Sequence, residues 1–211
     1  MRRLRESIIL LSAGAALAMP AAAAPDPVLL TLDAETFANL NVPATDSAED
    51  HHAALKAAFP GFEVGEHSWQ YGVNEFSLTP GGDPLVHRDY VVQRDGEILL
   101  RTPNIHASSS FWVAHRGVVD RVGVRAGDTY AMFLAGHGSA DCTRQHFSTT
   151  GARLPGHRLL ICSSEAVNAQ YYFDLPAALH DAPTMPEAAA LAEVKLLAFD
   201  IHWREPHPPR E

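Results

Sequence analysis

The sequence has few cysteines, no long apolar run after its first two dozen residues and no excess of basic residues. It has only two cysteines, Cys142 and Cys162, among 211 residues. Beyond residue 24 it has no apolar run long enough to cross a bilayer, so we expect no transmembrane segment in the mature chain. Its 16 lysines and arginines face 25 acidic residues, for a formal charge of −9. An acidic chain gains nothing from phosphate neutralisation, and we expect no nucleic-acid partner.

The first two dozen residues have the pattern of an export signal. Three arginines precede an uncharged apolar run over residues 8–19, which is about the length of a signal-peptide core. Small residues follow at 21–24, and the Ala21-x-Ala23 spacing predicts cleavage after Ala23. We therefore expect residues 1–23 to be a cleaved signal peptide and the mature protein to be periplasmic. The alternative is an uncleaved N-terminal anchor.

The two cysteines have three interpretations. In an oxidising compartment, two thiols 20 residues apart favour a disulfide, which stabilises by about 3 kcal/mol for a loop of this size. Cys142-x-x-x-His146, with His137 and His157 nearby, is the metal-site alternative, but it lacks a second close cysteine pair. A catalytic thiol is the third, and it would require its partner to be absent or exchanging.

Frequent breaks in the chain predict short elements. Its 15 prolines and 14 glycines favour short strands and turns over long helices. We expect an α+β fold with a mainly antiparallel sheet of short strands, two short helices at about 46–59 and 128–137, and one disulfide. Residues 28–205 are expected to form a single domain, followed by a flexible tail over 206–211.

Three local patterns are specific enough to predict detail. Asp95-Gly96, between strands expected at 85–93 and 97–101, is a strong hairpin signal. Asp128 is a natural N-cap for the second helix. The clearest strand is 194–204, where alternation places Leu197, Phe199 and Ile201 on one face. Further strands are expected at 28–32, 62–67, 73–79, 111–114, 118–124, 159–163 and 169–173.

Several of these residues occur together in a known family. The order of strand, capped helix, two cysteines, aromatic strand and terminal tryptophan resembles a bacterial envelope family of unknown function that includes sigma-E-regulated lipoproteins. The residues that carry the resemblance are Gly123-Val124, Gly127-Asp128-Thr129-Tyr130, Cys142, Cys162, Tyr172-x-Asp174 and Ile201-x-Trp203. These motifs are structural and imply no chemistry. The chain lacks the lipid-acceptor cysteine of the lipoproteins, so the resemblance does not imply anchoring.

Histidines are the main candidates for metal ligands. His137, His146 and His157 lie around the cysteine loop, and Asp200 and His202 share a strand face. The alternative is an exposed polar loop in the first case and an incidental surface pair in the second. Aromatic residues supply the candidate binding patch: Trp69, Tyr71, Phe111 and Trp112, which are otherwise core residues of short strands.

No catalytic constellation is visible in the sequence. Gly136-His137-Gly138-Ser139 ends a predicted helix, whereas a nucleophile elbow lies at a strand-to-helix turn. No phosphate loop or dinucleotide fingerprint occurs, and no cofactor is expected. The sequence thus predicts a non-enzymatic periplasmic protein that binds a partner, such as another envelope protein. The alternatives are a histidine-based metal binder and an unrecognised hydrolase.

Overall fold

The computed structural model describes residues 27–32, 48–70, 86–103, 110–145, 154, 156–164 and 167–202. The predicted signal peptide, the strand at 73–79 and the tail at 206–211 lie outside these residues. The strands and helices occur in the order β1 (Leu30–Leu32), α2 (Ala48–Ala58), β2 (Glu63–Gln70), β3 (Val86–Arg94), β4 (Glu97–Pro103), β5 (Ser110–Val113), β6 (Val118–Asp120), α3 (Tyr130–His137), β7 (Asp141–Gln145), β8 (Leu159–Ser164), β9 (Ala169–Asp174), α5 (Ala177–His180), α6 (Ala188–Leu191) and β10 (Leu196–His202).

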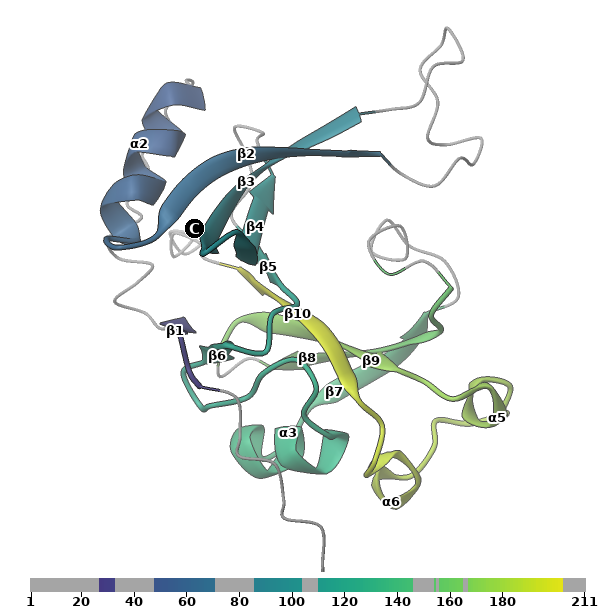
Figure 1. The fold of residues 1–211 in the computed structure, drawn as a ribbon. Coiled ribbons are helices and arrows are strands. Elements are labelled where there is room, and N and C mark those ends of the chain that lie inside the picture. The colour runs from purple at the N-terminus through teal and green to yellow at the C-terminus, as the bar shows by residue number, and fades with distance from the viewer. Residues whose placement is uncertain are drawn as a thin grey trace, which may run out of the picture.

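Eight strands form one antiparallel sheet in the order β2-β3-β4-β5-β10-β9-β8-β7. The last strand in the chain, β10, therefore lies in the middle and joins an N-terminal meander to a C-terminal one (Figure 1). The short strands β1 and β6 pair in parallel beside it. This architecture confirms the α+β prediction and its mainly antiparallel sheet.

The hairpin between β3 and β4 turns where it was predicted. Asp95 and Gly96 are its two central residues, with φ angles of 51° and 81°. Two successive positive φ values suit the right-handed twist of the flanking strands, and Asp-Gly is the pair that adopts them readily.

The N-cap of the second helix lies one residue later than predicted. Thr129, and not Asp128, is the N-cap of α3, and its Oγ1 accepts a hydrogen bond from the Met132 amide at 3.2 Å. The Asp128 carboxylate instead accepts from the Arg125 amide at 3.0 Å and closes the preceding turn. Both residues are good caps, so the sequence alone does not separate them. The short helices α5 and α6 and the strand β7 were not predicted.

The sheet has a main core on one face and a smaller cluster on the other. Phe133 of α3 packs against Tyr171 and Phe173 of β9 in the main core. The register between β9 and β10 shifts between Leu196 and Ala198. Because of this irregularity, Leu197 belongs to the smaller cluster and not to the face of Phe199, which corrects the simple alternation predicted for this strand.

Cys142 and Cys162 form the predicted disulfide. They lie directly opposite each other on β7 and β8, so the bond ties an edge strand to its neighbour. In the part of the chain that the structure describes, no helix is both long and apolar enough to span a membrane.

Candidate functional site

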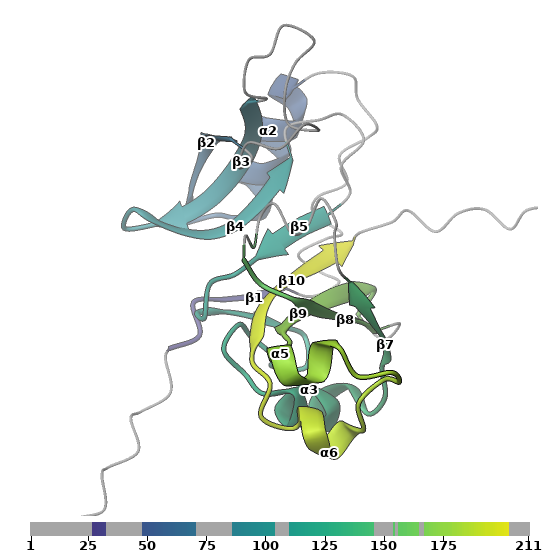
Figure 2. The same cartoon turned by 90° about the vertical axis from the view of Figure 1, so that its right-hand side faces the viewer.

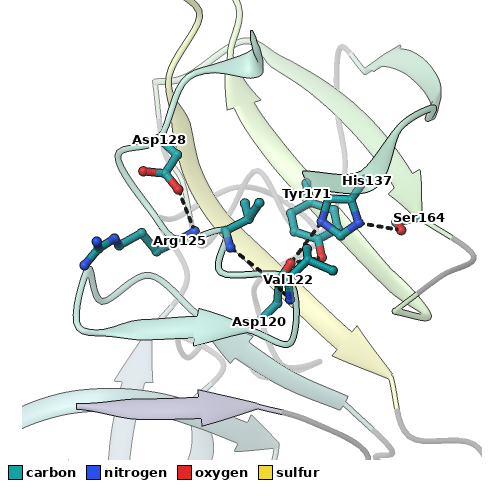
Figure 3. Close-up of polar contacts among 8 residues, drawn as sticks. Asp120, Val122, Arg125, Asp128, His137, Ser164 and Tyr171 are labelled. Atoms are coloured by element: carbon teal, nitrogen blue, oxygen red, sulfur yellow. Dashed lines mark hydrogen bonds and ion pairs between the residues drawn. The ribbon is translucent and has the colours of Figure 1, made fainter. Parts of the chain in front are cut away.

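Four polar side chains meet inside the core beside α3. Asp120 is the last residue of β6, His137 the last of α3 and Ser164 the last of β8, while Tyr171 is central in β9. The sheet order makes β8 and β9 neighbours, and His137 lies between Ser164 and Asp120, with Tyr171 beside it (Figure 3). Four separate elements thus contribute one polar group each.

The contacts form a continuous chain of hydrogen bonds. The Nδ1 atom of His137 lies 2.9 Å from Ser164 Oγ, and its Nε2 atom lies 3.0 Å from Asp120 Oδ2. The Tyr171 hydroxyl donates to the same Oδ2 atom at 2.6 Å. The other carboxylate oxygen, Oδ1, accepts from the amides of Val122 and Val124, both at 2.9 Å. Every acceptor of the Asp120 carboxylate is therefore used.

The electrostatics of this hydrogen-bond network keep Asp120 ionised. Burial by itself would raise its pKa, but hydrogen bonds from His137, Tyr171 and the Val124 amide outweigh burial and hold the pKa of Asp120 below its ordinary value of 3.8. Burial, and then the negative charge of Asp120, raise the pKa of the Tyr171 hydroxyl. Since the carboxylate accepts, His137 donates through Nε2, and in its neutral form Nδ1 accepts the Ser164 proton.

The composition of this group is that of a serine-hydrolase triad. A serine, a histidine and a carboxylate lie within hydrogen-bonding reach, with Ser164 on Nδ1 and Asp120 on Nε2, the reverse of the ring nitrogens that the triad uses. However, the side chains of His137 and Asp120 are completely buried, and Ser164 is 4% exposed. A substrate carbonyl cannot reach the serine oxygen without displacing core side chains, so this geometry stabilises the fold. Sequence analysis singled out only His137, because the other three positions carry no local motif.

The predicted metal ligands are not gathered into one place. His137 belongs to the buried hydrogen-bond network with Asp120. His157 pairs with Asp174 at 3.0 Å on the surface, and His146 lies outside the described residues. Asp200 and His202 do face each other, with 3.8 Å between Oδ2 and Nε2. Among the residues that the structure describes, no three potential ligands are grouped closely enough to hold a metal ion.

The predicted aromatic patch is also divided. Phe111 is completely buried in the main core, and Trp112, its neighbour in β5, is 6% exposed on the opposite face. The Trp112 ring packs on Tyr172 with 5.0 Å between centroids. Tyr71 and the side chain of Trp69 lie outside the described residues. For the two described members, the core interpretation is the one that the structure supports.

A different apolar surface is exposed on the helices. The residues of α3 include no Asp, Glu, Lys or Arg, and the one basic side chain, His137, is buried. The helix faces solvent with Ala131, Ala135 and Met132, which is 54% exposed. It contacts α6 (Figure 2). The three alanines of α6 are also exposed. We name this the α3–α6 surface: Val122, Ala131, Met132, Ala135 and Ala188–Ala190.

Comparisons with known proteins find a structural likeness but no match in sequence. No protein-family model matches the chain, and no curated protein matches it in sequence. The crystal structure of the uncharacterized protein yfeY from Escherichia coli is similar at 16% identity, with a TM-score of 0.44. The match covers 78% of this chain and 92% of that one.

Proposed function

We propose that this chain is an exported, non-enzymatic protein that binds another protein of the bacterial envelope through the α3–α6 surface. The single observation that carries the proposal is a solvent-exposed helix face without a charged side chain. A surface helix normally places charged or polar residues toward water. Its exposed residues here are apolar or small, which is typical of a helix that is covered by a partner.

Methionine supports the same interpretation. Four large apolar side chains are exposed in the described part of the chain, and Met132 of α3 is one of them, at 54%. A second, Val122, lies beside α3, because a Cβ atom at Gly136 would be 3.4 Å from its Cγ2 atom. Flexible thioether side chains adapt to partner surfaces of different shape. The exposed alanines are small enough to let a partner approach the helix backbone closely.

The structure gives less support to the alternative that the protein is a hydrolase. The serine, histidine and aspartate that would carry it are buried, and their hydrogen-bonding groups engage one another. The disulfide and the proposed export signal favour function outside the cytoplasm.

Site-specific photocrosslinking in cells tests the binding proposal. A photoreactive phenylalanine analogue replaces Met132, and in a matched strain it replaces Lys56, which is exposed on α2 at the other end of the sheet. We expect one discrete adduct from position 132, none from position 56, and loss of the adduct when Ala135→Glu places a charge on the surface. Equal adducts from both positions, or an adduct that survives Ala135→Glu, would contradict the proposal.

A covalent probe tests the alternative separately. A fluorophosphonate that labels activated serines should leave the folded mature protein unmodified, because Ser164 is shielded by its neighbours. Stoichiometric labelling at Ser164 would instead establish a hydrolase-like nucleophile, and it would do so whatever the crosslinking result.

A further inference from the structure

Both methionines of the expected mature chain face solvent. The sequence has four methionines, and Met1 and Met19 lie in the predicted signal peptide. The other two, Met132 and Met185, are 54% and 40% exposed. Methionine is ordinarily a core residue, because its flexible apolar side chain fills irregular gaps between other side chains. Here both side chains are open to small molecules dissolved around the protein.

The cysteine sulfurs do not compete for an oxidant. Cys142 and Cys162 are joined in the disulfide, and the described residues include no free cysteine. Oxidation of cysteine starts from a thiolate, which a disulfide does not have. Exposed methionine, in contrast, is oxidised to methionine sulfoxide. In the folded protein, the two exposed thioethers are therefore the sulfur groups that an oxidant meets first.

Met132 differs from Met185 in its surroundings. It belongs to the α3–α6 surface, whereas Met185 lies in the segment before α6, outside that surface as defined. Ala135 follows Met132 one turn later on the helix, and it is too small to shield the thioether. The polar side chains of α3, Tyr130 and His137, are buried. The helix thus presents no side-chain hydrogen-bond donor to solvent beside Met132.

We propose that Met132 is an oxidation site, and that its conversion to the sulfoxide releases the partner from the α3–α6 surface. This inference rests on the function proposed for that surface. The oxidant is hydrogen peroxide. The thioether sulfur attacks one peroxide oxygen, so an S–O bond forms and the O–O bond breaks. Hydroxide leaves and takes the proton of the transferred oxygen. The sulfur loses two electrons to the peroxide, and the products are the sulfoxide and water.

The new S=O group weakens binding because it is polar. On the free protein its oxygen accepts hydrogen bonds from water. A bound partner removes that water, and α3 supplies no exposed side-chain donor in its place. Burial of such an unpaired polar group lowers affinity by about tenfold or more. The fold itself is unaffected, since the side chain is exposed in both forms.

Peptide mass spectrometry of the purified mature protein tests the chemistry. In hydrogen peroxide, Met132 and Met185 should both oxidise at rates within about threefold of that of N-acetylmethionine amide. The urea midpoint of unfolding should be the same before and after oxidation. Oxidation of Met132 more than about tenfold slower than that of the free compound would overturn the assignment.

Photocrosslinking in cells tests the effect on binding. The photoreactive residue replaces Ala189 of α6, which leaves Met132 in place, and cells receive a partial dose of hydrogen peroxide before illumination. The fraction of Met132 present as sulfoxide should be about tenfold lower in the crosslinked adduct than in the uncrosslinked protein. Without oxidant, Met132→Gln, which is similar in length but polar, should lower the adduct about tenfold. Met185→Leu is the matched control and should change neither result.

The outcomes separate this inference from the proposed function. Equal sulfoxide fractions in the two pools would overturn the inference. Depletion of the sulfoxide together with an undiminished adduct from Met132→Gln would also overturn it, because the partner would then only shield the thioether. If untreated cells give no adduct from position 189, the proposed function fails and this inference fails with it. A normal adduct that is indifferent to oxidation of Met132 leaves the proposed function standing and removes this inference alone.

Discussion

The imidazole of His137 donates to the carboxylate of Asp120 across 3.0 Å, with both side chains completely buried. This contact joins the last residue of α3 to the last residue of β6, which are 17 positions apart in the sequence. Tyr171 donates to the same oxygen from β9. The position of the helix, and of the surface that we assign to partner binding, therefore depends on one buried carboxylate.

Replacing that carboxylate should lower the stability of the fold. Asp120→Asn removes the charge and places an amide where four donors converge, so buried groups lose their acceptor. We expect the free energy of unfolding in urea to fall by about 3–5 kcal/mol, the usual cost of breaking a buried pair on one side. Asp141→Asn, at an exposed position of β7, is the matched control and should change it by less than about 0.5 kcal/mol. A loss below about 1 kcal/mol for Asp120→Asn would contradict the role assigned to this residue.

The same carboxylate predicts acid sensitivity. Because the pKa of Asp120 is lower in the folded than in the unfolded chain, its stabilisation is complete above the unfolded value, near pH 4, and is lost as the pH falls through the folded value. The raised pKa of Tyr171 acts at the other end: its contribution is complete below about pH 10 and is lost as the pH rises further. Unfolding free energies measured from about pH 6 to pH 2 should fall more steeply for the wild type than for Asp120→Asn. Parallel curves would show that another carboxylate dominates.

Local chemistry explains which parts of this fold could be predicted. Asp95-Gly96 specifies its own turn, because both residues tolerate positive φ, and the structure has that turn. The two longer helices also follow from local pattern, since predicted helices at 46–59 and 128–137 correspond to Ala48–Ala58 and Tyr130–His137. Caps are less certain where two candidates are adjacent, as with Asp128 and Thr129.

The candidate site could not be predicted, because long-range topology assembles it. Ser164 is 27 positions from His137, and Tyr171 is 51 from Asp120. Nothing around Ser164 distinguishes it from an ordinary strand-end serine. The strand order, with β10 inserted between β5 and β9, decides which residues meet.

Arg144 should stabilise the C-terminal helices locally. From β7, its Nη1 atom donates to the carbonyl oxygens of His180, the last residue of α5, at 2.9 Å and of Ala182, beyond that helix, at 2.6 Å. Charged donors at unsatisfied helix carbonyls contribute about 1.5–3 kcal/mol. Arg144→Gln should therefore raise amide hydrogen exchange in residues 177–182 by about tenfold or more. Arg158→Gln is the control, because its half-exposed guanidinium lies 3.6 Å from Asp181 and such surface pairs contribute little. Equal exchange in the two variants would contradict this assignment.

The disulfide between Cys142 and Cys162 makes the final prediction, since it fixes the edge strand from which Arg144 extends. Cys162 is completely buried, so alanine is the appropriate replacement, and the double variant Cys142→Ala, Cys162→Ala should lose about 3 kcal/mol of unfolding free energy. Wild-type protein kept under reductant should lose a similar amount, because it lacks the same constraint on its unfolded state. Intact-mass measurement with an alkylating agent should detect no free thiol in the native protein and two after reduction. Labelling of two thiols without reductant would show that the bond is absent in solution and would reopen the metal-ligand interpretation of Cys142.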